Sequence, residues 1–287
     1  MYSCLGITLF FNEYELLFLQ LKTLSRVCDH IIIVEAECNW RGEQKKNLEF
    51  GSFLERFGDY IKGISYEYLK IPKENFKRVK DLNLDRHIAF KNEGMCRSIP
   101  FLNYKSKYYI YNDVDEIFSD GQIEEIKLCI NDFFKGKKEF KFWYHNYYLN
   151  WRCFYFRNWK YILRNRDWNQ IFCKNKPVIG DQCAHLFDYE SGQEFALQFK
   201  AGGRPLSTQT GLRTIGYHFS YLYSLETKLE NFAHTELTHQ ASIVQKRKEQ
   251  KIAAVHLDMK CKSIPITDIQ IQDLHEHIDI FRPFIGS

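Results

Sequence analysis

The residues best suited to chemistry lie near the middle of the chain, where a hydrophobic run ends in acidic residues. The run covers residues 108–111, and Asp113, Asp115 and Glu116 follow it. Aromatic and β-branched residues predict a buried strand here. Carboxylates at the end of such a strand are costly unless another charge compensates them. A divalent cation that also binds a phosphate-bearing ligand is the natural compensator.

The spacing of Asp113 and Asp115 places both side chains on one face of an extended segment. Hard carboxylate oxygens suit a Mg²⁺ or Mn²⁺ ion that bridges two phosphates, so the pair is predicted to share such an ion. Asp115 is counted as catalytic because the cation acts as a Lewis acid on a departing diphosphate. Glu116 is expected to point the other way and brace a helix or loop. The alternative for the whole motif is a structural cap.

A second informative stretch begins at Gly216 and contains a histidine among aromatic residues. His218 or His234 is predicted to complete the metal shell or contact the diphosphate, and the alternative for His218 is a satisfied core position. Glu226 lies close to a predicted helix start. A carboxylate there is either a cap or a general base that deprotonates an acceptor hydroxyl. The alternatives for the base are Asp167, Asp181 and Asp188.

Three further residues are predicted to contact a nucleotide. Glu35 ends a second hydrophobic run and could bind a ribose or base edge, while Lys45 in the following loop could meet phosphate. Loop solvation is the alternative for both. Arg97, on a predicted helix, could clamp a phosphate or form an ion pair with Asp113 or Glu116.

Alternating strands and helices must position these residues. Strands are predicted at 4–11, 31–34, 64–69 and 108–111, with helices at 13–24, 53–57 and 86–100. This alternation predicts an α/β fold with a mostly parallel central sheet and crossover helices. Ligands bind at the carboxyl ends of the strands in such sheets. Later strands are predicted at 140–148, 151–156 and 214–223, and a helix at 227–233.

Composition limits the class of protein. The chain has 287 residues, 45% of them hydrophobic, and a net charge of only +4, which argues against a nucleic-acid partner. Nine cysteines form no C-x-x-C pair, so a reducing compartment fits. No segment has the length and apolarity of a transmembrane span, and residues 1–21 do not resemble a signal peptide. A cytoplasmic protein is expected, with peripheral membrane contact as an option.

Five blocks of the sequence, taken in order, resemble glycosyltransferase family 17, the family of β-1,4-mannosyl-glycoprotein 4-β-N-acetylglucosaminyltransferase. The blocks are residues 11–17, 33–50, 93–97, 112–117 and 216–234. The chain departs from the family pattern at Phe118, where Pro is usual, at Tyr217, where Trp is usual, and at Asn39, where Thr is usual. Residues 165–212 and those after 240 match nothing in the pattern, so the resemblance informs the reaction more than the acceptor.

The resemblance implies a GT-A-type, Rossmann-like catalytic domain over residues 1–240. The charged residues 241–287 are expected to form a helical extension packed on it. It also implies an inverting transfer of N-acetylglucosamine from a UDP donor to a glycan hydroxyl, with Mn²⁺ or Mg²⁺. Asn12, in the first block, joins the predicted nucleotide contacts. Bacterial or viral glycan assembly in the cytoplasm is the implied setting. The alternatives are a metal-dependent phosphohydrolase and an inactive glycan-binding protein.

Overall fold

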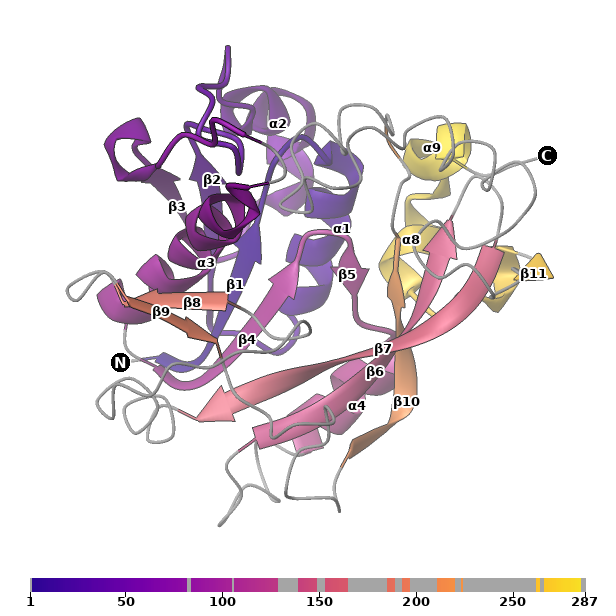
Figure 1. Cartoon of the computed structure of the whole chain (residues 1–287). Coiled ribbons are helices and arrows are strands. Elements are labelled where there is room, and N and C mark those ends of the chain that lie inside the picture. Colours follow the sequence, from indigo (N-terminus) through magenta and orange to yellow (C-terminus); the bar gives the residue numbers. More distant parts are fainter. Residues whose placement is uncertain are drawn as a thin grey trace.

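The structure is a computed structural model, and most of the first 128 residues are described in it. The described residues are 2–81, 84–104, 106–128, 139–148, 153–164, 185–188, 193–196, 211–219, 223, 262–263 and 266–284. Within them, nine strands form one sheet and two more form a separate hairpin. The fold is α/β, as the sequence predicts (Figure 1).

Four parallel strands make up the first half of the sheet. They are β1 (Tyr2–Leu9), β2 (His30–Ala36), β3 (Tyr66–Ile71) and β4 (Ser106–Asp113), in the spatial order β3-β2-β1-β4. Their residues are rich in Ile, Val, Leu and Tyr because both faces of this part of the sheet are covered. The mostly parallel sheet predicted for the first 120 residues is confirmed, and each strand lies within a few residues of its predicted position.

Helices cover the two faces of these strands. Helix α1 (Tyr14–Leu24) and helix α2 (Phe50–Phe57) pack on one face, where their leucines and phenylalanines join the core. Helix α3 (Arg86–Asn103) lies against β1 and β2 on the other face (Figure 1). From β1 the chain adds β2 and then β3 on one side of the sheet, and α3 then carries it back to β4 on the other side of β1. Because parallel crossovers are right-handed, this reversal of direction places α3 on the opposite face from α1 and α2. Two 3₁₀ turns complete this half, at Gly58–Ile61 and Lys73–Asn75.

The second half of the sheet is mainly antiparallel. Beyond β4 the order is β7-β6-β10-β5, with β11 paired to β7 and only β6 and β10 parallel. Helix α4 (Asp120–Leu128) contacts β10, and the β8–β9 hairpin contacts α3. The strands are β5 (Glu116–Ile117), β6 (Glu139–Tyr148), β7 (Cys153–Arg164), β8 (His185–Asp188), β9 (Gln193–Ala196), β10 (Gly211–His218) and β11 (Lys262–Ser263).

Two sequence predictions change in this half. The strand predicted at 214–223 ends at His218, because the amide of Phe219 turns away to bond the carbonyl of Asp115. The strand predicted at 151–156 extends to Arg164 as β7. The helix predicted at 227–233 lies outside the described residues.

The C-terminal segment packs on α1. Ile271, Leu274 and Phe281 are buried in the same core cluster as Phe18 of α1. Helical structure was predicted after residue 240, and the described part contains only short elements. They are the 3₁₀ turn Ile266–Asp268, α8 (Gln272–Glu276), α9 (Ile278–Phe281) and the 3₁₀ turn Arg282–Phe284. The predicted domain boundary at residue 240 stays a prediction.

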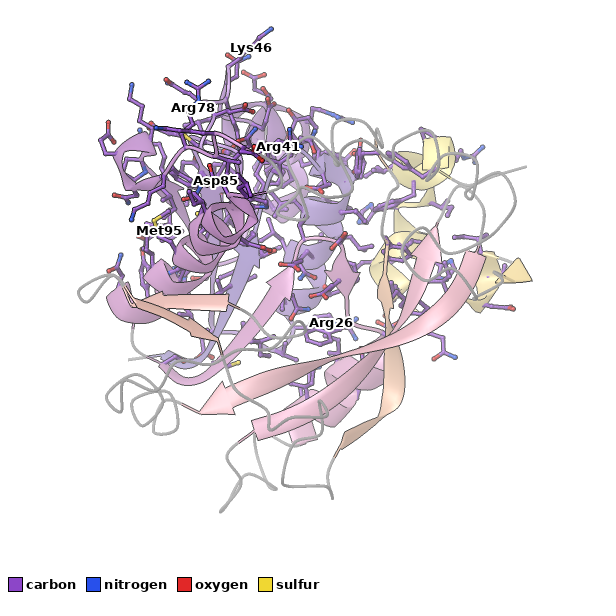
Figure 2. The ribbon with its side chains drawn as sticks, viewed as in Figure 1. Arg26, Arg41, Lys46, Arg78, Asp85 and Met95 are labelled. Atoms are coloured by element: carbon purple, nitrogen blue, oxygen red, sulfur yellow. The ribbon has the colours of Figure 1, made fainter. Side chains whose placement is uncertain are left out.

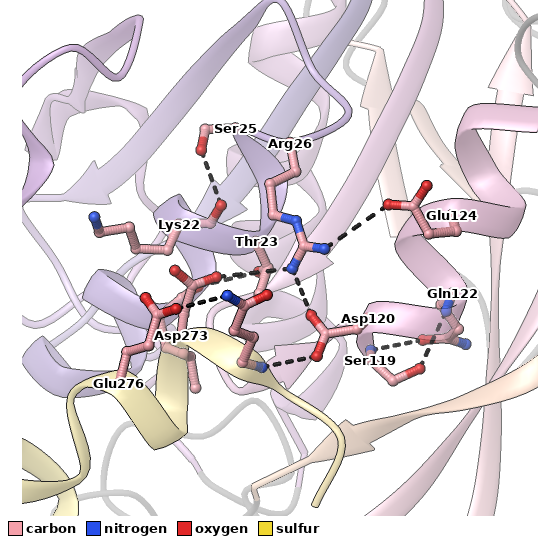
Figure 3. A network of polar contacts seen from close by, with 12 residues as sticks. Lys22, Thr23, Ser25, Arg26, Ser119, Asp120, Gln122, Glu124, Asp273 and Glu276 are labelled. Carbon is pink, nitrogen blue, oxygen red and sulfur yellow. Dashed lines mark hydrogen bonds and ion pairs between the residues drawn. The ribbon is translucent and has the colours of Figure 1, made fainter.

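Asp120, at the start of α4, joins three parts of the chain (Figure 3). Its carboxylate pairs with Arg26, just after α1, at 2.5 Å and accepts the Gln272 amide at 2.8 Å. Its own amide donates to the carbonyl of Gln270 at 2.9 Å. These contacts fix the C-terminal segment against the sheet. No helix in the described part of the chain is long and apolar enough to cross a membrane.

Candidate metal and nucleotide site

The acidic motif was predicted as an extended segment, but it forms a tight turn, here called the acidic turn (Asp113–Glu116), which connects β4 to β5. Asp113 is the last residue of β4, and Glu116 is the first residue of β5. The turn thus lies at the carboxyl end of β4, next to the loop that follows β1. Strand β2 lies on one side of β1 and β4 lies on the other, so the strand order reverses between β1 and β4. The carboxyl ends of these two strands form the topological switch point, where α/β sheets bind ligands.

Hydrogen bonds within the turn fix its path. The Asp113 amide donates to Glu116 Oε2 at 3.1 Å, and Asn112 Nδ2 donates to the Glu116 carbonyl at 2.9 Å. From α1, Gln20 Nε2 donates to the Asp113 carbonyl at 3.4 Å. The bracing role expected of Glu116 is therefore directed at the turn itself.

The turn is largely enclosed. Asp115 is 5% exposed and Glu116 only 1%, whereas Asp113 is half-buried. Val114 and Phe118 anchor the segment in the core. Carboxylates in such surroundings have a high desolvation cost, so this part of the chain favours ligands that bring positive charge.

Strand β10 brings a distant part of the sequence to the turn. His218 lies opposite Glu116 in the antiparallel β10–β5 pair, and the Phe219 amide donates to the Asp115 carbonyl at 2.8 Å. Two segments that the sequence singles out, separated by about a hundred residues, thus meet at one edge. The register places His218 beside the acidic turn, but its side chain lies outside the described residues. Its role as a ligand stays a prediction.

The two aspartates fit one mode of cation binding. The described residues contain no group of three or more His, Cys, Asp or Glu side chains arranged to hold a metal ion. Mg²⁺ commonly uses only one or two protein carboxylates, with water and substrate phosphates completing its shell. Asp113 and Asp115 suit that mode. His234, the other predicted ligand, and Glu226, the predicted base, lie outside the described residues.

Glu35 has a full set of protein partners. The side chain is fully buried, and its oxygens accept the amides of Glu49 at 2.8 Å and Phe50 at 3.2 Å and the hydroxyl of Tyr68 at 2.9 Å. Burial, followed by the Glu35 charge, raises the pKa of Tyr68. A carboxylate at the first amides of α2 also interacts favourably with the helix dipole. Glu35 therefore holds the loop after β2 and the start of α2, and its predicted nucleotide contact stays a prediction.

Lys45 lies between this junction and the loop after β1. Its Nζ is 3.4 Å from Glu35 Oε1 and 4.4 Å from the centroid of the Phe11 ring. Burial lowers the pKa of Lys45, although the Glu35 charge acts in the opposite direction. Asn12 is half-buried in the loop after β1, at the switch point. Arg97 lies on α3 as predicted, and its side chain is outside the described residues. The nucleotide contacts of these three residues stay predictions.

The loops after β2 and β3 are joined at the same edge of the sheet. Gly42 has φ +74°, and a Cβ there would lie 2.4 Å from the Lys77 carbonyl, so only glycine fits. The Val79 amide donates to the Arg41 carbonyl at 2.8 Å. Figure 2 shows that Arg41, Lys46 and Arg78 gather at this corner. Asn92 on α3 supports the junction, with bonds to the main chain of Trp40 and Lys77.

Gln20, Asn92 and Tyr223 support these loops and were not singled out from the sequence. Tyr223 donates to Glu15 Oε2 at 2.6 Å, and Arg56 binds Glu15 Oε1 at 2.7 Å, so the segment after β10 is tied to α1. Burial, followed by the Glu15 charge, raises the pKa of the Tyr223 hydroxyl. Gln20 offered a signal, as a polar residue within the leucine-rich stripe of α1. Tyr223 offered none, because its partner lies 208 residues away.

Comparisons with known proteins assign no family to the chain. No protein-family model matches the chain, and no curated protein matches it. A crystal structure of S. aureus TarS, residues 1–349, is similar at 8% identity and a TM-score of 0.34, over 59% of this chain and 49% of that chain. The chain thus spans about half the length of that structure. A similarity this low carries no argument about function, and the resemblance to glycosyltransferase family 17 stays a prediction.

Proposed function

We propose that this chain is a metal-dependent, inverting glycosyltransferase of the GT-A type. Its expected donor is UDP-N-acetylglucosamine, and its acceptor is a glycan hydroxyl. The observation that carries the proposal is the acidic turn at the switch point, with β10 bonded to it through Phe219 and Asp115. A turn of this kind offers two carboxylates at the edge where α/β sheets bind nucleotides.

Each residue has a proposed role. Asp113 and Asp115 would hold Mn²⁺ or Mg²⁺, which supplies positive charge to the diphosphate when bound. Glu116 and Asn112 keep the main chain of the turn in place. Lys45 and Asn12 lie on loops at the same edge and are proposed to contact the nucleotide. His218 and His234 remain candidate ligands, and Arg97 and Glu35 remain candidate nucleotide contacts.

The reaction would be a single displacement. The acceptor oxygen forms a bond to the anomeric carbon of the donor as the bond from that carbon to the phosphate oxygen breaks. The electron pair of the broken bond leaves with UDP, and the hydroxyl proton passes to a carboxylate. Glu226 is the proposed base for this proton transfer. Orienting the two substrates accounts for much of the expected rate enhancement.

A donor-hydrolysis screen tests the proposal without knowledge of the acceptor. The purified chain is incubated with UDP-, GDP- and CMP-linked sugars, with Mn²⁺, Mg²⁺ or a chelator, and nucleotide release is measured. Slow hydrolysis of UDP-N-acetylglucosamine that requires the metal is expected. The absence of both hydrolysis and a UDP-dependent rise in melting temperature would contradict the proposal.

Two other outcomes would favour the alternatives. Phosphate release from a generic phosphate ester, without cleavage of any nucleotide sugar, would favour a phosphohydrolase. Tight glycan binding that needs neither metal nor nucleotide would favour an inactive glycan-binding protein.

A further inference from the structure

Polar side chains are buried beneath the acidic turn, on the face of the sheet that α1 covers. Thr8, Gln20 and Asn112 are each fully buried. Thr8 and Asn112 are in register on β1 and β4, so their side chains share one face. A Cβ at Gly6, two residues before Thr8, would lie 3.4 Å from the Leu24 side chain. That contact identifies the shared face as the one under α1.

Gln20 lies over Thr8. Helix α1 runs back along β1, and four helix residues advance by about the same 6 Å as two strand residues. Because Leu24 lies over Gly6, Gln20 is placed over Thr8 and close to Asn112. Most of the buried face of α1 is leucine and phenylalanine, so an amide at this position is unfavourable unless it serves a purpose.

The hydrogen bonds of Gln20 indicate that purpose. Its Nε2 donates to the Asp113 carbonyl at 3.4 Å, and its Oε1 has no hydrogen-bond partner among the described residues. A glutamine buried only for stability is expected to satisfy both ends of its amide. The one described hydrogen bond of the Gln20 side chain is instead directed at the residue that connects β4 to the acidic turn. This contact uses the main chain and does not involve the Asp113 carboxylate.

We propose that Gln20 is a positioning residue for the cation site. By holding the Asp113 carbonyl from beneath, it sets the main-chain orientation from which the Asp113 side chain extends. Asn112 and Glu116 fix the other end of the turn through the Glu116 carbonyl and the Asp113 amide. Gln20 therefore prepares the turn for a divalent cation without touching that cation. The inference rests on the proposed function, since it concerns the same site.

Metal binding by matched variants tests this assignment. Gln20→Met keeps the length and volume of the side chain and removes its donor. Thr23→Val is the control, because Thr23 is also fully buried on α1, and the described hydrogen bonds of its hydroxyl go only to carbonyls of its own helix, at Leu19 and Gln20. Free Mn²⁺ is measured by electron paramagnetic resonance as each full-length protein is titrated in the presence of UDP. Donor hydrolysis is then measured at saturating Mn²⁺.

Gln20→Met is expected to weaken Mn²⁺ binding about three- to tenfold, the range for loss of one hydrogen bond. Its hydrolysis rate at saturating Mn²⁺ is expected to stay within about twofold of the wild type, as expected for a residue that acts only through Asp113. Thr23→Val is expected to bind Mn²⁺ as the wild type does. Gln20→Leu, which also removes the donor and adds no charge beside the cation site, provides a second variant if Gln20→Met does not fold, and it should weaken binding about as much.

The outcomes separate this inference from the proposed function. If the wild type binds Mn²⁺ and cleaves the donor but the Gln20 variants bind Mn²⁺ as Thr23→Val does, the positioning role is wrong and the proposed function stands. A fall in saturating turnover with unchanged Mn²⁺ affinity also overturns the positioning role. If the wild type binds no Mn²⁺ with UDP, both proposals fail.

Discussion

Two buried carboxylates, Glu35 and Asp115, lie at the carboxyl ends of β2 and β4, two strands of one sheet. Glu35 is bound on both oxygens by the amides that begin α2, by Tyr68 and by Lys45. Asp115 lies in a turn whose main chain is bonded by the side chains of Asn112, Gln20 and Glu116 and by the Phe219 amide. At the first site, the carboxylate holds the surrounding main chain in place. At the second site, hydrogen bonds to the main chain of the turn position its carboxylates. A buried acid at a strand end therefore does not by itself indicate a ligand.

The largest expected effect is at Asp115. Asp115→Asn keeps the size of the side chain and removes its charge, so donor hydrolysis should fall about a thousandfold, equivalent to about 4 kcal/mol of transition-state stabilisation. The free energy of unfolding should change by less than about 1 kcal/mol, because removing one of three neighbouring negative charges offsets any lost contact. Steady-state hydrolysis and urea denaturation check the two values.

Asp279→Asn is the control for this variant, since Asp279 is 82% exposed and pairs only with Arg282 in the described structure. Its activity should equal that of the wild type. An Asp115→Asn protein that retains more than a tenth of wild-type hydrolysis would remove the distinction between the two carboxylates.

Glu35→Gln should have the opposite profile. Glutamine replaces one carboxylate oxygen with an NH2 group, which cannot accept the main-chain amides that now donate to Glu35. Lys45 also loses the negative charge with which it pairs. The free energy of unfolding should fall by about 3 kcal/mol. Urea denaturation measures this loss, with Glu55→Gln on the exposed side of α2 as a control that should change it by less than about 0.5 kcal/mol.

The same variant tests the nucleotide contact predicted for Glu35. A structural role lowers the free energy of unfolding and leaves the KM for the donor unchanged in the folded protein. A nucleotide contact raises that KM.

Asp273 provides a third and smaller test, as a half-buried carboxylate whose nearest described cation, Arg26, lies 3.9 Å away. Burial raises its pKa, and Arg26, at 3.9 Å, acts against the shift. Between the ordinary and the raised pKa the folded state binds more protons than the unfolded state, so stability falls as pH rises through this window. Asp273→Asn removes that penalty and should stabilise the protein by about 0.5 kcal/mol at pH 7, with the gain lost by about pH 4. Thermal unfolding at both pH values measures it, and an equal effect at both would contradict the assignment.

The parallel half of the fold could be predicted from the sequence because the patterns that indicate its strands and helices are local. Hydrophobic runs and helical spacing place β1 to β4 and α1 to α3 within a few residues of their positions. The end of β10 was missed because it depends on a bond from Phe219 to Asp115, which no local pattern predicts. The short C-terminal helices were expected only as a general helical extension, since their contacts with α1 involve residues far apart in the sequence.

In the candidate site too, features with a local sequence pattern were predicted and features that depend on long-range contacts were not. The acidic turn and His218 were identified from residue type and spacing, and the structure places them on neighbouring strands. Gln20 and Tyr223 act through contacts that span 93 and 208 residues, so their partners are visible only in three dimensions. Glu35 shows the converse, because its position at a strand end indicates a ligand site while its partners give it a structural role.

The packing of Phe281 against the core around Phe18 has a consequence for synthesis of the protein. The strands β1 to β4 leave the ribosome early, but the apolar side of α1 cannot be fully covered until residues beyond 270 have been translated. At about 5–20 residues per second, that surface stays incomplete for roughly ten seconds or more after α1 emerges. The nascent chain would therefore leave the side of α1 around Phe18 uncovered for most of its synthesis, and chaperones that bind apolar segments would recognise that surface.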